Sequence, residues 1–197
     1  MTPDGRVAGV LLAAGASTRF GDRNKLLADL DGKPLVRHAA ETLSSADLDA
    51  VAAVVDPADP GVRDALSGLG LAVLENRDAS AGQATSVRRG VEWTRERDAD
   101  AVVFALGDMP RVDAATVDRL VAAYRDGRGS ALAAGYDGNR GNPVLFDARH
   151  FDALAAIDGD TGGRAVFRNA EDAAVVETDD SGVRVDVDTP DDLERSR

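Results

Sequence analysis

The chain has 197 residues and a formal net charge of −12, with 35 acidic side chains, 23 basic side chains and no cysteine. This length suits one domain, residues 1–197, with a substantial core. The absence of cysteine excludes disulfides, thiolate zinc sites, iron–sulfur clusters and a cysteine nucleophile. The negative charge argues against nucleic-acid binding, which requires a basic face.

The composition also bears on the compartment and on the kind of metal. No apolar run approaches the roughly 20 residues that span a bilayer, and the N-terminus lacks the pattern of a signal peptide. We therefore expect a cytoplasmic protein with no membrane partner. Only two of the 23 basic residues are lysines. Scarce lysine beside abundant Arg, Asp and Ala favours a halophile, whose acidic surface keeps it in solution, and a biased base composition is the alternative explanation. Because His38 and His150 lie far apart in the sequence, any metal is expected to be hard and oxygen-liganded, such as Mg²⁺.

Strands and helices are predicted to alternate along most of the chain. Apolar runs predict strands at 7–14, 50–55, 71–75, 101–106 and 130–135. Helical periodicity predicts helices at 34–43, 59–69 and 83–97, and one that Asp113 caps. Further on we expect an extended segment at 141–146, a helix near 148–155, short strands at 173–178 and 182–187, and a terminal helix. The alternation predicts a parallel sheet with helices on both faces, whose ligands bind beyond the carboxyl ends of the strands.

The first motif, LAAGASTRFGDRNK, directly follows the first predicted strand. A glycine-containing loop in this position can present backbone N–H groups to an anion, and Arg19 and Lys25 add full charges. Residues 15–37 carry five basic and three acidic side chains, a net charge of +2, so the rest of the chain carries −14. Turn chemistry accounts for the glycines but not for this clustered charge. The motif is neither a Walker A loop nor a dinucleotide fingerprint, and we interpret it as an anion site.

The second motif, VVFALGDMP, places Asp108 at the carboxyl end of a buried strand. A plain turn is the alternative interpretation, because Gly, Asp and Pro all favour turns. On the evidence of this motif alone, Asp108 is a candidate ligand-binding residue.

The third motif, DVDTPDDL, begins the terminal helix. A helix start explains Thr189 as the N-cap, the proline after it and the two acidic residues of the first turn. It does not explain Asp186 and Asp188, which alternate around Val187 and would point to one side of an extended segment. Together with Asp108, they suggest a metal held between separate strand ends.

A phosphate-binding loop and oxygen ligands for a cation indicate nucleotide phosphate chemistry. The sequences LAAGASTRFGDRNKLL, GDMP and DVDTPDDL closely resemble the MobA-like nucleotidyltransferases that build dinucleotide forms of the molybdenum cofactor. AGQATSVRRG, GNRGNPVLF and GDTGGR resemble the cytidylyltransferase branch. The resemblance covers nearly the whole chain. It implies a Rossmann-like three-layer α/β/α sandwich with a mostly parallel sheet, of the nucleotide-diphospho-sugar transferase type.

The resemblance implies a Mg²⁺-dependent enzyme that moves CMP from CTP to a phosphorylated acceptor, molybdopterin, and releases pyrophosphate. A molybdoenzyme or its maturation chaperone is the implied partner. Catalytic roles are implied for Arg19, Lys25 and Asp108, and Mg²⁺ binding for Asp108 and Asp188, with Asp186 as the weaker candidate. The residues implied to bind nucleotide are Leu12, Ala13, Ala14, Gly15, Arg19, Lys25, Gly82, Gln83 and Ser86, and those implied to bind the acceptor are Asn142 and Arg164.

Two positions depart from the pattern of the cytidylyltransferase branch. Gln83 stands in a segment where that branch often has Gly-Met-Ser-Ser-Ser, and Asn142 stands where it often has His before proline. Arg164 has the alternative role of a surface arginine at a helix start. The other activities left open are guanylyl transfer to molybdopterin, nucleotidyl transfer to phospholactate or to a sugar phosphate, and a non-catalytic cofactor-binding chaperone. A dehydrogenase is disfavoured by the missing dinucleotide fingerprint.

Overall fold

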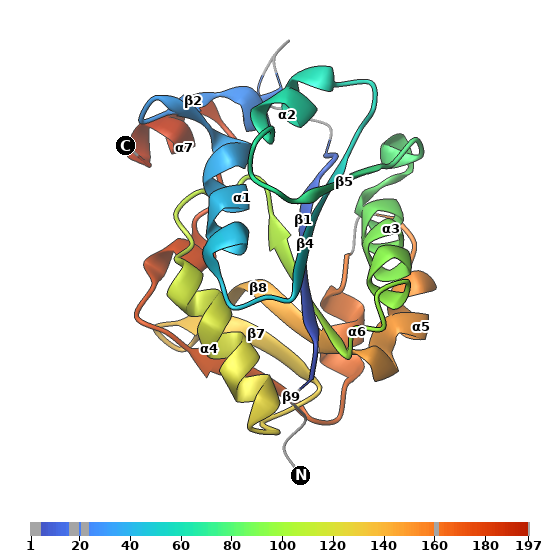
Figure 1. Ribbon diagram of the computed structural model, residues 1–197. Coiled ribbons are helices and arrows are strands. Elements are labelled where there is room, and N and C mark those ends of the chain that lie inside the picture. Colours follow the sequence, from blue (N-terminus) through green and yellow to red (C-terminus); the bar gives the residue numbers. More distant parts are fainter. Residues whose placement is uncertain (1–4, 16–19, 21–23, 160–161, 197) are drawn as a thin grey trace.

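A seven-stranded sheet forms the centre of the computed structural model, which describes residues 5–15, 20, 24–159 and 162–196 (Figure 1). The strand order is β5-β4-β1-β6-β8-β7-β9. Among the described strands of this sheet, β8 alone runs antiparallel to its neighbours. The strands of this sheet are β1 (Val7–Ala13), β4 (Ala50–Val55), β5 (Ala72–Glu75), β6 (Ala101–Leu106), β7 (Ala131–Tyr136), β8 (Asn139–Asp147) and β9 (Ala173–Glu177).

Helices cover both faces of this sheet (Figure 1). One face carries α1 (Leu35–Ser45), α2 (Pro60–Ala65) and α4 (Ala114–Arg125), and the other carries α3 (Gln83–Arg95), α5 (Phe151–Ala155) and α6 (Arg164–Asn169). The C-terminal helix α7 (Pro190–Arg195) lies at one end of the molecule. This is the predicted three-layer sandwich with a mostly parallel sheet. Every helix in the described ranges is too short or too polar to cross a bilayer.

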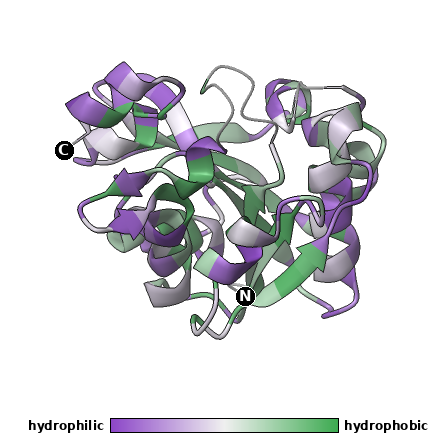
Figure 2. Ribbon diagram, turned by 90° about the horizontal axis from the view of Figure 1, so that it is seen from above, coloured by the Kyte–Doolittle hydropathy of each residue, from purple (hydrophilic) through white to green (hydrophobic). Residues whose placement is uncertain are grey.

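Two hydrophobic cores, one on each face of the sheet, hold the layers together. The core under α1 and α4 includes the fully buried Leu43 and Leu120, and the core under α3 includes Phe146. Each such side chain stabilises the fold by roughly 1.5–3 kcal/mol. Figure 2 shows the strands largely hydrophobic and the surrounding helices largely hydrophilic on their outer sides. At Gly90 of α3, an added Cβ would lie 2.8 Å from Val10 and 2.9 Å from Phe104, so glycine lets this helix approach the sheet closely.

The structure corrects the predicted elements at three places. Residues 182–187 form no strand, because Ser181–Arg184 is a 3₁₀ helix that the Asp180 side chain caps. The helix predicted at 59–69 ends at Ala65. A hairpin of β2 (Asp29–Leu30) and β3 (Lys33–Pro34) was not predicted. Its turn residues Asp31 and Gly32 both have positive φ, the conformation that an Asp-Gly hairpin turn requires.

Candidate active site

The candidate site lies at the point where the strand order reverses. From β1 the chain continues to β4 and β5 on one side, and then returns to β6 on the other side of β1. Strand β1 pairs with β4 on one side and with β6 on the other, all three in parallel. Their carboxyl ends therefore meet at one edge, which is where an open α/β sheet forms a ligand crevice. Beyond β6, the Gly107 N–H donates to the Leu12 carbonyl at 3.0 Å. This bond holds the turn that carries Asp108 against the end of β1.

Three side chains from distant parts of the sequence meet at this edge. Lys25 Nζ lies 2.7 Å from Asp108 Oδ2 and 2.5 Å from Asp188 Oδ1. The Lys25 side chain is 14% exposed, Asp108 is 21% exposed and Asp188 is 36% exposed. We call these three residues the Lys25 cluster. Because both carboxylates contact one nitrogen, their oxygens are close enough together to share a single ion.

Local structure explains how each member of the cluster is placed. Asn24 caps the 3₁₀ helix η1 (Lys25–Leu27) by accepting a hydrogen bond from the Leu26 N–H at 2.9 Å. The Val187 N–H donates to the Asp108 carbonyl at 2.9 Å, and the Val187 side chain is fully buried. Asp188 is thereby directed towards Lys25, whereas Asp186 on the other side of Val187 is exposed.

The start of α7 then fixes the segment that follows Asp188. Thr189 and Asp192 form a reciprocal capping box, and Pro190 occupies the first turn. The Asp192 carboxylate also accepts a hydrogen bond from the Asp188 N–H at 3.2 Å. The Thr189 hydroxyl and the Arg195 guanidinium lower the pKa of Asp192 to about 2. A capping box involves only residues close together in the sequence. Here it positions Asp188, the cluster residue that directly precedes the N-cap.

The charges of the cluster are compensated only in part. Burial lowers the pKa of Lys25, but the carboxylates of Asp108 and Asp188 raise it by more, so that the net change is upward. The ammonium therefore stays charged, and the formal charges of the three side chains sum to −1. Burial raises the pKa of Asp186, and repulsion by Asp188 and Asp108 raises it further. Asp108 Oδ1 is buried and accepts no hydrogen bond from the described residues.

A divalent cation fits this donor set. An uncompensated negative charge and a buried carboxylate oxygen without a donor are both features that a cation would satisfy. The described residues hold no group of three or more histidine or acidic side chains suited to a metal. Mg²⁺ needs no such group, because one or two carboxylates usually bind it together with water and substrate phosphates. Asp108 and Asp188 would supply the carboxylates.

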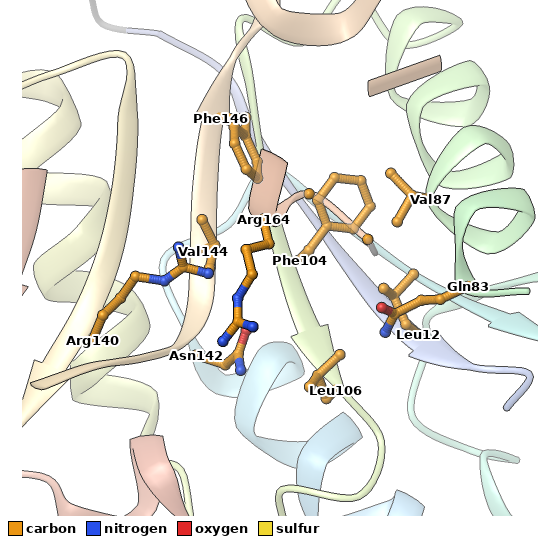
Figure 3. A pocket seen from close by; sticks show the side chains of 12 residues that line it. Leu12, Gln83, Val87, Phe104, Leu106, Arg140, Asn142, Val144, Phe146 and Arg164 are labelled. Atoms are coloured by element: carbon orange, nitrogen blue, oxygen red, sulfur yellow. The ribbon is translucent and has the colours of Figure 1, made fainter. Parts of the chain in front are cut away.

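A pocket of about 430 Å³ opens near the carboxyl ends of β1 and β6 (Figure 3). Leu12 and Leu106, the paired residues near the ends of β1 and β6, line it, and Asp108 follows Leu106 by two positions. We call it the central pocket. Its remaining lining residues are Gln83, Val87, Phe104, Arg140, Asn142, Val144, Phe146, Gly162, Gly163 and Arg164.

The structure brings some of the predicted nucleotide-binding residues to this pocket and not others. Leu12 and Gln83 line it. Gly82 precedes α3 with a φ of +109°, a conformation that favours glycine. Ser86 lies in the interior, where its hydroxyl accepts a hydrogen bond from Asn76 Nδ2 at 3.0 Å. Ala13 and Ala14 are buried, and Gly15 is exposed.

Both residues predicted to bind the acceptor, Asn142 and Arg164, also line the central pocket. Arg19 lies outside the described residues. Sequence reasoning missed Arg140, although its basic side chain within the quoted segment GNRGNPVLF was a usable signal. It also missed the aromatic wall of Phe104 and Phe146, whose ring centroids are 6.5 Å apart in an edge-to-face arrangement.

Comparison with known proteins agrees with this geometry. The sequence profile of the MobA-like NTP transferase domain matches residues 9–175. The chain belongs to the MobA-like NTP transferase family. It is therefore a member of a nucleotidyltransferase family, as the motifs predicted, and its fold is that of the nucleotide-diphospho-sugar transferases.

Individual relatives of this MobA-like protein carry different names. It is 31% identical over 196 residues to the nicotine blue oxidoreductase of Paenarthrobacter nicotinovorans, covering 96% of this chain and 95% of the relative. It is 36% identical over 120 residues to the molybdenum cofactor guanylyltransferase of Rhodobacter capsulatus, covering 60% and 59%. The crystal structure of Rv0371c from Mycobacterium tuberculosis in complex with manganese is similar, with a TM-score of 0.80, 28% identity and 97% of each chain covered. Family membership therefore leaves the substrates to be argued from the site.

Proposed function

We propose that this MobA-like enzyme transfers CMP from CTP to the phosphate of molybdopterin in a Mg²⁺-dependent reaction that releases pyrophosphate. The observation that carries the proposal is the Lys25 cluster, an ammonium held between two carboxylates at the crevice of an open α/β sheet. It combines a phosphate-binding cation with two ligands for a divalent metal. The central pocket opens at the same edge of the sheet and offers space for a base or an acceptor.

The reaction requires little from the protein beyond positioning and charge. A phosphate oxygen of the acceptor attacks the α-phosphorus of CTP in line and forms a new P–O bond. The bond to the β-phosphate oxygen breaks, and pyrophosphate leaves with the electron pair. The attacking oxygen is already an anion at neutral pH, so no strong general base is needed, and orientation supplies much of the rate enhancement.

Lys25 would neutralise the charge that grows on the departing pyrophosphate. Its flexible four-carbon stem allows the ammonium to move from the carboxylates to the triphosphate, which would release both carboxylates for the metal. Mg²⁺ bound by Asp108 and Asp188 would supply Lewis-acid chemistry and a template for the phosphates. Arg19 is expected to share the contact with the triphosphate.

The relatives support parts of this assignment. The R. capsulatus relative is named for the molybdenum cofactor, although for guanylyl transfer, and the M. tuberculosis structure is a complex with manganese. The preference for CTP rests on the resemblance around AGQATSVRRG. An oxidoreductase is less favoured, because an ammonium between two carboxylates suits phosphate and metal rather than hydride transfer. The product would pass to a molybdoenzyme or its maturation chaperone.

The test is pyrophosphate release from CTP, GTP and ATP, each with Mg²⁺ and molybdopterin. We expect the highest turnover with CTP and none after the metal is chelated. Phospholactate and a sugar 1-phosphate serve as competing acceptors. Equal or greater turnover with GTP would refute the cytidylyl assignment, and release without any acceptor preference would refute the pterin assignment.

A further inference from the structure

Two arginines line the central pocket, and a third lies near enough to repel one of them, all without carboxylate partners in the described ranges. Arg140 lies near the start of β8, and Arg164 and Arg168 lie one helical turn apart on α6. Among the described residues, none of the three forms an ion pair with an acidic side chain. Figure 3 shows the guanidinium groups of Arg140 and Arg164 on the same side of the pocket as Asn142, with Gln83 and Leu12 opposite. We call these three residues the arginine cluster.

The arginine cluster is unfavourable for the protein taken by itself. Burial lowers the pKa of Arg140, and the positive charges of Arg164 and Arg168 lower it further. In a chain with 35 acidic side chains, partners are not scarce. Like charges that are left uncompensated beside a pocket indicate an anion-binding site, because an anion removes both the repulsion and the cost of burial.

The orientation of Arg140 is fixed by an aromatic ring. Its guanidinium carbon lies 4.4 Å from the centroid of Phe167, which is buried. Stacking of this kind holds the guanidinium plane while leaving its N–H donors for a ligand. Besides the two arginines and the polar Gln83 and Asn142, the other side chains that line the pocket are apolar, and they include the neighbouring rings of Phe104 and Phe146. The pocket therefore suits a flat apolar body that carries a negative charge at one side.

The arginine cluster is separated from the Lys25 cluster by the path of β8. Residues 144–147 of this strand pair with β6, which delivers Asp108, but Arg140 pairs only with Gly135 of β7. Arg140 thus lies on the part of β8 that has left β6. A phosphate held for reaction beside Asp108 would be paired with Lys25. Because a phosphate monoester carries a charge of only about −1.5 to −2, it would not also neutralise the three arginines.

We propose that the arginine cluster binds an anionic group of the acceptor other than the phosphate that reacts, and that Arg140 determines the specificity for it. The acceptor class is a flat heterocycle with an acidic substituent remote from its reactive phosphate. This inference rests on the proposed function for the identity of the bound molecule as an acceptor. The charge preference itself follows from the pocket alone.

The test measures binding rather than turnover. Fluorescence anisotropy compares 6-carboxypterin, a flat anion without phosphate, with the uncharged 6-hydroxymethylpterin. We expect the wild-type protein to bind the carboxylate at least about tenfold more tightly, as one charge-assisted hydrogen bond predicts. Arg140→Gln should abolish this preference, and Arg140→Lys should retain part of it. Arg128→Gln is the matched control, because Arg128 is exposed and does not line the pocket.

Several outcomes would overturn the inference: equal affinity for the two pterins, no binding of either, or a preference that survives Arg140→Gln in a protein that still melts cooperatively. The proposed function fails differently, through the absence of Mg²⁺-dependent pyrophosphate release. A carboxylate preference without pyrophosphate release would refute the transferase proposal and leave the anion site standing.

Discussion

The Lys25 cluster and the arginine cluster handle charge in opposite ways. In the first, an ammonium contacts two carboxylates at 2.7 and 2.5 Å, so the protein satisfies its own cation and keeps a net negative charge. In the second, Arg140 is stacked on Phe167 and faces two further arginines, with no carboxylate partner for any of them in the described ranges. Under the proposed function, the first region would bind a divalent cation in place of Lys25, whose ammonium would turn to a phosphate. The second is arranged for an anion.

The largest expected effect is the loss of a metal ligand. Asp108→Asn and Asp188→Asn keep the size of the side chain and remove one negative charge, so turnover should fall by about 10³-fold, which corresponds to the several kcal/mol that a metal supplies. Initial rates of pyrophosphate release across a Mg²⁺ titration would measure this. Asp186→Asn is the matched control and should lose less than about tenfold, because Asp186 is an exposed residue and the ion pairs of Lys25 are with Asp108 and Asp188. Inactive Asp186→Asn with near-normal Asp188→Asn would move the second ligand two residues upstream.

Removal of the cation from the same cluster should have the next largest effect. Lys25→Ala should reduce turnover by roughly 10²-fold, as expected when one group that stabilises transition-state charge is lost. Lys33→Ala should change turnover little, because the Lys33 side chain is 47% exposed and its ammonium pairs with Glu41, at 2.8 Å, rather than with the Lys25 cluster. The two variants are compared by kcat at saturating CTP. Equal losses would show that the ammonium between the carboxylates has no special role.

A pH effect is expected at the wall of the central pocket. His150 packs edge-to-face on Phe146 of the pocket wall with 6.2 Å between centroids, and its Nε2 lies 2.8 Å from Ser130 Oγ. Burial lowers the pKa of His150 from its ordinary value of 6.5. The unfolded chain therefore takes up the proton first, so stability is fully present above pH 6.5 and falls as the pH drops through the lowered value.

His150→Gln should flatten the decline of the melting temperature below pH 6.5. Melting curves recorded at intervals of half a pH unit would measure this slope. Over one such interval, the free energy of unfolding changes by roughly 0.7 kcal/mol for each proton by which the folded and unfolded states differ. His38→Gln is the matched control, because it removes the other histidine and leaves the Ser130 contact intact. An unchanged slope in His150→Gln would show that this histidine does not link pH to the stability of the pocket wall.

The smallest expected effect tests whether the charges of the arginine cluster repel one another. Arg168→Gln removes one of three like charges, so the free energy of unfolding should rise by a few tenths of a kcal/mol at low salt, whereas Lys25→Ala should lower it. The gain should vanish at about 1 M salt, where the Debye length is near 3 Å. Differential scanning calorimetry at two ionic strengths would detect it. A loss of stability in Arg168→Gln at low salt would mean that the cluster is not repulsive.

Local patterns in the sequence were sufficient for the layers of the fold. Apolar runs marked the strands of the central sheet, and the capping box at Thr189 was readable because it depends on neighbouring residues. The predicted strand at 182–187 was wrong because alternation of Val with polar residues cannot report the Asp180 side chain that caps a 3₁₀ helix there. The hairpin at Asp31 and Gly32 was missed even though the Asp-Gly pair is a local signal.

The sequence by itself determined which residue types this protein brings to phosphate chemistry, since Lys25, Asp108 and Asp188 each lie within a recognisable motif. Only the tertiary structure decided that these three residues form one cluster, because the backbone hydrogen bond from Val187 to Asp108 joins segments 79 positions apart. It alone also revealed Arg140. The antiparallel direction of β8 brings the first residues of that strand beside the end of β7. Strand direction depends on long-range pairing, which leaves no mark in the local pattern.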